Sequence, residues 1–266
     1  MSNWHNESGR PLSAIPWLEA HHKAKFVERT EFAKRVINKS PKRIVDLGCG
    51  PGIWLELFSQ HAQSGCELFG IDADEGSIAH AINRSHTWAQ ETNFQCINID
   101  TNPEEIPEAD VYLAFNIFPY IRNISRLMET LKRKLRPDGV VVIRQYDGSL
   151  LRIGPMSPKD RSLIDTSLQS SVLGSSQFMH YDLDRVFEAI SDSCFEGKEV
   201  EFEVFKRVAP YPDDFLSYFT NTIDWTLDHI SEDAGEKLLN WYTRIKQNKF
   251  STPSYFSEVD LVAWLS

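Results

Sequence analysis

Three glycines, Gly48, Gly50 and Gly52, stand at alternate positions directly after an apolar segment at residues 43–45. Glycine adopts positive φ angles at little cost, and its missing side chain lets a bound molecule approach the backbone closely. The residues from Ile53 onward follow a helical pattern, and the first turn of a helix offers unpaired backbone N–H groups. A buried strand, a glycine-rich turn and a helix in this order predict the first unit of a nucleotide-binding α/β domain.

The acidic residue in front of the glycines narrows the choice of ligand. Asp46 precedes Gly48 by two positions. A carboxylate there would repel the pyrophosphate of a dinucleotide and attract an ammonium group. The turn therefore favours a nucleoside that carries an amino acid over a dinucleotide.

The same pattern, acidic-x-Gly-x-Gly-x-Gly, resembles the cofactor turn of class I S-adenosylmethionine-dependent methyltransferases. Asp46, Gly48, Gly50 and Gly52 fill every fixed position of that turn. The resemblance implies that the cofactor is S-adenosyl-L-methionine and that the turn contacts its amino-acid end. Cys49 lies within the turn, where we expect a small residue at a variable position rather than a nucleophile.

Two more acidic residues end predicted strands. Asp72 ends the apolar segment 69–72, at the distance expected for a carboxylate that accepts hydrogen bonds from ribose hydroxyls. Asp100 ends the segment 94–100 and matches the family acid that binds the adenine amino group. Each alone could equally cap a helix or a turn, but their register with successive strand ends indicates the cofactor site. The resemblance implies a cofactor-binding set of Asp46, Gly48, Cys49, Gly50, Gly52, Asp72, Ala73, Ile99, Asp100, Asn116 and Ile117.

Predicted strands and helices alternate along the chain, which implies a parallel sheet with helices on both faces. The resemblance implies an α/β, Rossmann-like methyltransferase fold: a seven-stranded, mostly parallel sheet with an antiparallel last strand, and a helical cap. About fifty residues separate the last two predicted strands, and an insertion of that length is expected to cover the substrate pocket. The expected organisation is an N-terminal helical segment or cap at 1–40, the cofactor-binding core at 41–147, a cap insertion at 148–181, a core helix and strand at 182–209, a helical cap insertion at 210–256 and the final strand at 257–266.

Composition limits the partners and the location. The 266 residues are 41% hydrophobic, enough for one main domain with an elaboration. No apolar run reaches the length of a membrane span and the first residues lack a signal-peptide pattern, so we expect a cytoplasmic protein with no membrane partner. Four scattered cysteines predict reduced thiols and no metal site. The net charge of −10 argues against nucleic acid as a partner. The long aromatic cap insertion suits an enclosed pocket for a small-molecule substrate, and the oligomeric state stays open.

Methyl transfer from a sulfonium requires mainly that the two partners be positioned, and an oxygen acceptor also needs a nearby base. His180, followed by Tyr181 and Asp182, is the preferred candidate base. His180 could equally be an ordinary residue at the start of a helix, with its imidazole already hydrogen-bonded. Tyr146, at the end of the fifth predicted strand, is the second catalytic candidate.

The candidate substrate-binding residues are Tyr120, Arg144, Tyr181 and Phe219. Tyr120 closes the run Asn-Ile-Phe-Pro-Tyr, which is one residue longer than the Asn-Pro-Pro-Tyr of methyltransferases that act on nucleic-acid bases or glutamine side chains. The extra residue argues against a flat exocyclic amine as the acceptor.

A helical pattern at residues 16–39 precedes the first strand. If this helix folds over the cofactor, as leading helices do in related small-molecule enzymes, then His21, His22, Lys25 and Arg29 face the site. An ordinary surface helix is the simpler alternative for any one of them.

These observations predict an S-adenosylmethionine-dependent methyltransferase that acts on a small-molecule metabolite, in natural-product biosynthesis, by O-, N- or C-methylation. A protein or peptide side chain is the alternative acceptor. A cofactor-binding regulator without catalysis is disfavoured, because the whole cofactor-binding set is present.

Overall fold

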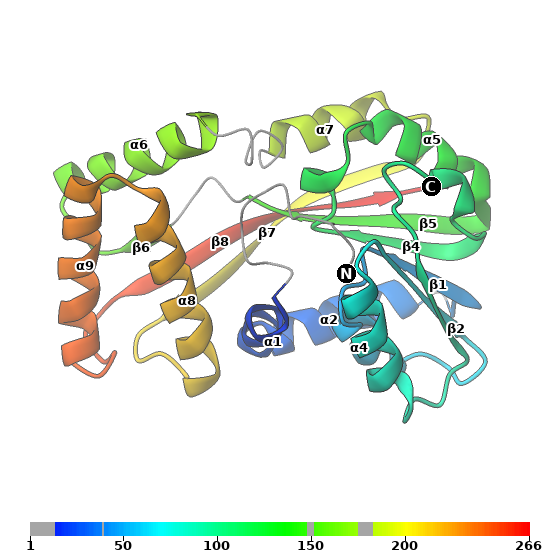
Figure 1. Cartoon of the computed structure of the whole chain (residues 1–266), viewed down its shortest axis with the longest axis horizontal. Helices are drawn as coiled ribbons and strands as arrows, with labels where there is room; N and C mark the ends of the chain where they lie inside the picture. The colour runs from blue at the N-terminus through cyan, green and yellow to red at the C-terminus, as the bar shows by residue number, and fades with distance from the viewer. Residues whose placement is uncertain (1–13, 39, 148–151, 175–182) are drawn as a thin grey trace.

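The computed structural model describes residues 14–38, 40–147, 152–174 and 183–266. Its centre is an eight-stranded sheet in the order β3-β2-β1-β4-β5-β8-β6, with β7 also paired to β8 (Figure 1). The strands are β1 (Arg43–Leu47), β2 (Glu67–Asp72), β3 (Thr92–Cys96), β4 (Ala109–Phe115), β5 (Leu135–Tyr146), β6 (Arg152–Gly154), β7 (Lys198–Val208) and β8 (Tyr255–Leu265).

Helices cover both faces of this sheet. Apolar side chains of α5 and α7 pack on one face, and those of α2, α3 and α4 pack on the other, so the sheet is buried between two hydrophobic cores. The α-helices are α1 (Ile15–Ala24), α2 (Phe26–Ile37), α3 (Ile53–Ser59), α4 (Glu75–Ser85), α5 (Ile124–Lys134), α6 (Pro158–Gly174), α7 (Leu183–Asp192), α8 (Asp213–His229) and α9 (Glu232–Gln247).

The strand directions confirm a mostly parallel sheet with an antiparallel last strand. Strands β1 to β5 pair in parallel, whereas β8 runs antiparallel to both β5 and β7. The sheet has eight strands in the described residues instead of the seven expected. The reason is that β8 extends past β5, and the three residues of β6 pair with that extension.

A third hydrophobic core fills the space around the extended end of β8. Aromatic and aliphatic side chains of α6, α8 and α9 pack there against β6 and the neighbouring parts of β7 and β8. Figure 1 shows these three helices grouped at the end of the molecule away from β1 and β2, with α1 between the two parts. The residues between β7 and β8, together with α6, therefore form a helical layer around this third core, called the inserted layer below.

The N-terminal helical pattern is two helices and not one. The break falls at Lys25, whose φ of −115° and ψ of 18° are not helical. The Lys25 ammonium lies 2.5 Å from Oε2 of Glu258 on β8, and the two side chains are 3% and 1% exposed. Tyr218 of α8 donates its hydroxyl hydrogen to the other oxygen of Glu258. One buried ion pair therefore joins the α1–α2 junction, the last strand and the inserted layer.

None of the helices in the described ranges combines the length and apolarity that crossing a membrane would require.

Replacing Lys25 tests the role of this ion pair. Lys25→Met leaves the Glu258 carboxylate buried without a cation, so we expect the free energy of unfolding to fall by about 3–5 kcal/mol. Lys23→Met, at an exposed position in the last turn of α1, should change it by less than about 0.5 kcal/mol. Urea unfolding at neutral pH measures both. Equal stabilities of the two variants would show that the ion pair does not hold the helices in place.

Candidate functional site

A cavity of about 410 Å³ lies at the carboxyl ends of the parallel strands. Its walls come from the turn after β1, the end of β2, the segment after β3 and the ends of β4 and β5. The N-terminal helices and Tyr218 of α8 complete the enclosure. Open α/β sheets bind their ligands in this position, because the strand ends leave a crevice there.

The glycine-rich turn is one wall. Gly48, Gly50 and Gly52 have φ angles of +71°, +52° and +78°, in the left-handed region that side chains disfavour. A Cβ on Gly48 would lie 2.6 Å from Cγ2 of Ile117, at the end of the neighbouring β4. The turn thus requires glycine both for its backbone angles and for its close approach to β4.

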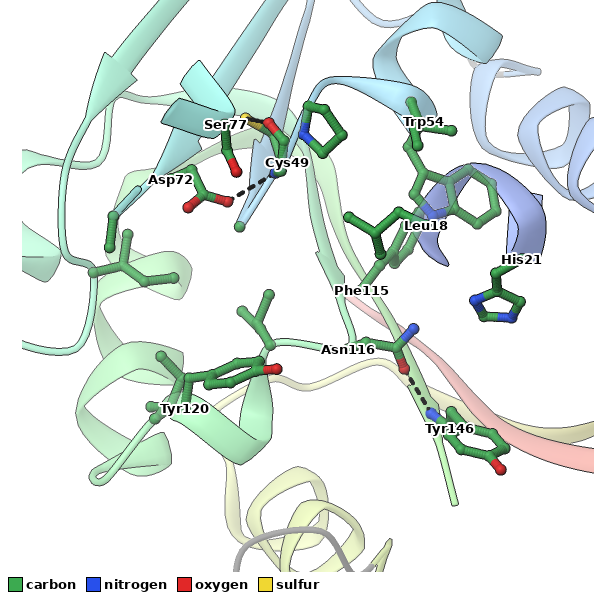
Figure 2. Close-up of a pocket in the computed structure, with 18 of the residues that line it drawn as sticks. Leu18, His21, Cys49, Trp54, Asp72, Ser77, Phe115, Asn116, Tyr120 and Tyr146 are labelled. Atoms are coloured by element: carbon green, nitrogen blue, oxygen red, sulfur yellow. Dashed lines mark hydrogen bonds between the residues drawn. The ribbon is translucent and has the colours of Figure 1, made fainter. Parts of the chain in front are cut away.

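Asp72 fixes the shape of that turn. Its carboxylate accepts the N–H of Gly50 at 2.7 Å and the N–H of Asp74 at 2.9 Å. Burial raises the pKa of Asp72, while the backbone hydrogen bonds oppose the rise. Figure 2 shows Asp72 beside Cys49 and Ser77 at one end of the cavity.

Asp100 lies close to the same end, on the segment that follows β3. The strand stops at Cys96, so the expected strand to residue 100 is too long by four residues. Both oxygens of Asp100 are engaged by Arg122, through its backbone N–H at 2.8 Å and its Nε at 2.6 Å. Asp100 and Arg122 both line the cavity as a pair.

Asp46 occupies β1 behind the wall rather than the cavity surface. Its side chain is buried, and burial together with the charge of Asp72 raises the pKa of Asp46 well above its ordinary value. Both effects favour the neutral form of Asp46, whereas the sequence pattern led us to expect a charged carboxylate facing an ammonium group.

The ends of β4 and β5 are joined at the floor of the cavity. Asn116, which follows β4, has a positive φ of 57°. Its backbone N–H donates to the carbonyl of Arg144, and its side-chain oxygen accepts the backbone N–H of Tyr146 at 2.8 Å. Figure 2 shows this last bond, with the Tyr146 ring beyond it.

The second end of the cavity is built by the N-terminal helices. His21 stacks on Tyr218 with 4.6 Å between ring centroids and an 11° interplanar angle. The Arg29 guanidinium lies 4.8 Å from the ring centroid of Trp54 and donates to Nδ1 of His22 and of His21 at 3.1 and 3.4 Å. In Figure 2, His21, Trp54 and Tyr146 lie on the side opposite Asp72.

The charge state of this end follows from burial. Burial and the nearby Arg29 and Arg84 lower the pKa of His22 to about 3, so its imidazole is neutral at physiological pH. Burial, followed by the charge of Arg144, lowers the pKa of Arg29 to about 10, so its guanidinium stays positive at pH 7.

The structure places most of the predicted residues on the cavity wall. Those that line it are Gly48, Cys49, Gly50, Asp72, Ala73, Ile99, Asp100, Asn116, Ile117, Tyr120 and Tyr146. His180 and Tyr181 lie outside the described residues. Asp46 and Gly52 support the turn without lining the cavity.

Two predicted substrate-binding residues are placed elsewhere, and their expected role needs correction. Arg144 is ion-paired with Asp260 at 2.6 Å and with Glu203 at 2.7 Å, so its charge is neutralised within the sheet. Phe219 is fully buried in the core of the inserted layer, where it stacks on Phe215 at 5.5 Å. Neither lines the cavity.

Sequence reasoning did not assign several wall residues. Trp54, Phe115 and Tyr218 line the cavity, although each fits an ordinary hydrophobic pattern within its own helix or strand. His21 and Arg29 were singled out on the N-terminal helix, but nothing local distinguishes them from surface residues. The burial of His21 depends on the contact of α1 with α8, which is remote in sequence, and Arg29 packs on Trp54 of α3.

Comparisons with known proteins agree with this architecture. A family model described as a methyltransferase domain matches residues 19–266. A ubiquinone biosynthesis O-methyltransferase of Coxiella burnetii is 22% identical over 111 residues, 42% of this chain and 46% of the relative. A trans-aconitate 2-methyltransferase of Methylobacterium nodulans is 30% identical over 135 residues, 49% of this chain and 50% of the relative. The chain spans about half the length of these curated relatives.

A solved structure is similar along the whole chain. Phosphoethanolamine N-methyltransferase 2 of Haemonchus contortus, in complex with phosphomonomethylethanolamine and S-adenosylhomocysteine, has a TM-score of 0.58 and 17% identity. The match covers 100% of this chain and 60% of that one. At 17% identity, this similarity shows that the two proteins share a fold and no more.

The buried acid behind the turn predicts a pH-dependent stability. Because the pKa of Asp46 is raised on folding, the folded protein binds more protons than the unfolded chain above the ordinary carboxyl pKa of about 3.9. Raising the pH through this window therefore lowers the free energy of unfolding. Asp46→Asn removes the ionisation, so its stability relative to the wild type should increase from pH 4.5 to pH 8.

Urea unfolding across that pH range checks the prediction, with Asp184→Asn at an exposed position of α7 as the control. A constant difference between Asp46→Asn and the wild type would contradict the raised pKa.

Proposed function

Because the chain belongs to the class I S-adenosylmethionine-dependent methyltransferase family, we propose that it transfers a methyl group from S-adenosylmethionine to a small-molecule acceptor. The observation that carries the proposal is the cavity itself. It joins a glycine turn, fixed by Asp72, to an aromatic enclosure formed by Trp54, Phe115 and Tyr146. A cofactor and its acceptor need two such adjoining compartments.

The residues at the first end fit the cofactor. The absence of side chains on Gly48 and Gly50 leaves the backbone accessible, as the amino-acid end of the cofactor requires. Each oxygen of Asp72 accepts one backbone N–H, and each retains a second lone pair for a ribose hydroxyl. Ile99 and Asp100 supply an apolar surface and a carboxylate for the adenine. When bound, the cofactor supplies a methyl group activated by its sulfonium.

The chain's own contribution is mainly positional. Asn116 holds the ends of β4 and β5 together, and the aromatic side chains of Trp54, Phe115 and Tyr146 exclude water around the acceptor. Orientation of two reactants in a fixed geometry lowers a barrier by about 7–11 kcal/mol. Tyr146 faces the cavity and is the catalytic candidate within the described residues; His180 remains a candidate base from the sequence alone.

The acceptor is proposed to be a small metabolite of secondary metabolism. A volume of about 410 Å³ lies in the range of small-molecule sites. The two sequence relatives are named for small-molecule chemistry, which supports the same acceptor class. The aromatic enclosure suits a selective enzyme, and selectivity of this kind supports a role in natural-product biosynthesis.

Cofactor binding is tested most simply at the glycine turn. Isothermal titration calorimetry with S-adenosylhomocysteine should show binding to the wild type. Gly48→Val should weaken it at least about tenfold, because its Cβ would collide with Ile117 and a β-branched residue disfavours positive φ.

Gly65→Ala is the matched control, since a Cβ there meets no atom within 4 Å, and its affinity should equal that of the wild type. Circular dichroism verifies that both variants are folded. Binding of NADH in place of S-adenosylhomocysteine, or equal affinities of the two variants, would contradict the proposed site.

A further inference from the structure

Strand β7 forms one edge of the sheet. It has 11 residues and pairs with β8 along its whole length without a bulge. Its other side has no strand partner among the described residues, and Figure 1 shows β7 alongside β8. A long and regular edge strand presents a row of backbone N–H and C=O groups to which another strand can pair.

The even-numbered residues of β7 carry these outward-facing groups. Gly197 and Ser266 exchange backbone N–H and C=O bonds at one end of the β7–β8 ladder, and Ala209 donates its N–H to Ser254 at the other end. In an antiparallel ladder, the residues that bond to a given neighbour alternate along the strand. The odd-numbered residues therefore bond to β8, and the backbone groups of the even-numbered residues from 198 to 208 point away from it.

The same even-numbered positions expose apolar side chains. Phe202, Val204 and Val208 are 57%, 60% and 65% exposed. Lys198 and Lys206 flank the first two of them on the strand. An exposed apolar group of this kind, next to unpaired strand backbone, marks an interaction surface.

We propose that β7 pairs antiparallel with β7 of a second copy of the chain, so that two sheets join across a two-fold axis. Such a contact uses the same patch on both copies, so the patch must be complementary to itself. The register that we assign is centred on Glu203. It places Phe202 of each copy opposite Val204 of the other, and an aromatic side chain opposite a β-branched one is a favourable cross-strand pair.

The charges on the other face of β7 fit the same register. Glu199 of each copy lies opposite Arg207 of the other, which gives two pairs of opposite charge. Glu203 faces its own copy at the axis. Its two carboxylate oxygens already accept hydrogen bonds, one from Arg35 and one from Arg144, so its charge is compensated within each copy.

Neighbouring registers lack this complementarity. Moving the axis one residue toward the N-terminus sets Lys198 opposite Lys206, and like charges directly opposite each other are destabilising. The same shift sets Glu201 opposite Glu203. Moving the axis one residue toward the C-terminus sets Phe202 opposite Lys206. The pattern of side chains therefore favours a second copy in one register over an arbitrary foreign strand.

Pairing through β7 leaves the cavity in place. The cavity walls come from the strand ends on the other side of β8, from the N-terminal helices and from Tyr218, and the described lining includes no residue of β7. The inference is therefore independent of the proposed function.

Sedimentation velocity on the full chain, over about a hundredfold range of concentration, tests the pairing. The wild type should form a dimer as the concentration rises. Phe202→Glu and Val204→Lys each set a charge opposite an apolar side chain of the other copy, at two places in the dimer. Each should raise the dissociation constant of the dimer at least about tenfold.

An equimolar mixture of these two variants tests the register. In the mixed dimer, the introduced carboxylate of one chain lies opposite the introduced ammonium group of the other, and the remaining Phe202–Val204 pair is intact. The mixture should therefore associate more tightly than either variant alone.

Leu239→Lys is the matched control, because Leu239 is an apolar residue of α9 that is 49% exposed. It should form the dimer as the wild type does. Circular dichroism verifies that all three variants are folded.

Four results would overturn the inference. The first is a wild type that stays monomeric at every concentration, which would leave the edge to a strand of a different protein. The second is an undiminished dimer in Phe202→Glu and Val204→Lys. The third is an equal loss in Leu239→Lys, and the fourth is a mixture that associates no better than its components.

Discussion

The buried ion pair between Lys25 and Glu258 is the interaction on which the cavity depends. It links the break between α1 and α2 to β8, and Tyr218 of the inserted layer donates to the same carboxylate. Since neither ion is exposed to water, separating them would leave an uncompensated buried charge. The pair therefore fixes α1 against α8, and this contact places His21 on the ring of Tyr218 at the edge of the cavity.

The two ends of the cavity have different structural origins. The cofactor end is formed by local features of the sheet, namely the turn after β1 and the carboxylate of Asp72 that holds it. The acceptor end is assembled from the N-terminal helices, the ends of β4 and β5, and one residue of α8. The N-terminal helices also border the glycine turn, because a Cβ on Gly50 would lie 3.7 Å from Cδ1 of Leu18 on α1.

The features predicted well from the sequence are those with a local signal. The alternation of polar and apolar residues predicted β7 with its observed bounds, Lys198–Val208, and the glycine turn indicated its own positive φ angles. The errors come from contacts between distant residues. Arg144 pairs with Asp260, 116 positions away, and β6 exists because β8 extends past β5. The burial of His21 likewise depends on Tyr218 of α8, and no pattern within the N-terminal helices reveals it.

A crystal structure of the protein with S-adenosylhomocysteine tests the central claim most directly, namely that one cavity holds the cofactor at the glycine turn and leaves its other end for the acceptor. The account predicts the amino-acid portion against Gly48 and Gly50, the ribose hydroxyls on Asp72, and the adenine beside Ile99 and Asp100. The space bordered by His21, Tyr146 and Tyr218 should remain open and continuous with the ligand sulfur. A ligand that fills this second space, or that binds away from Asp72, would contradict the account.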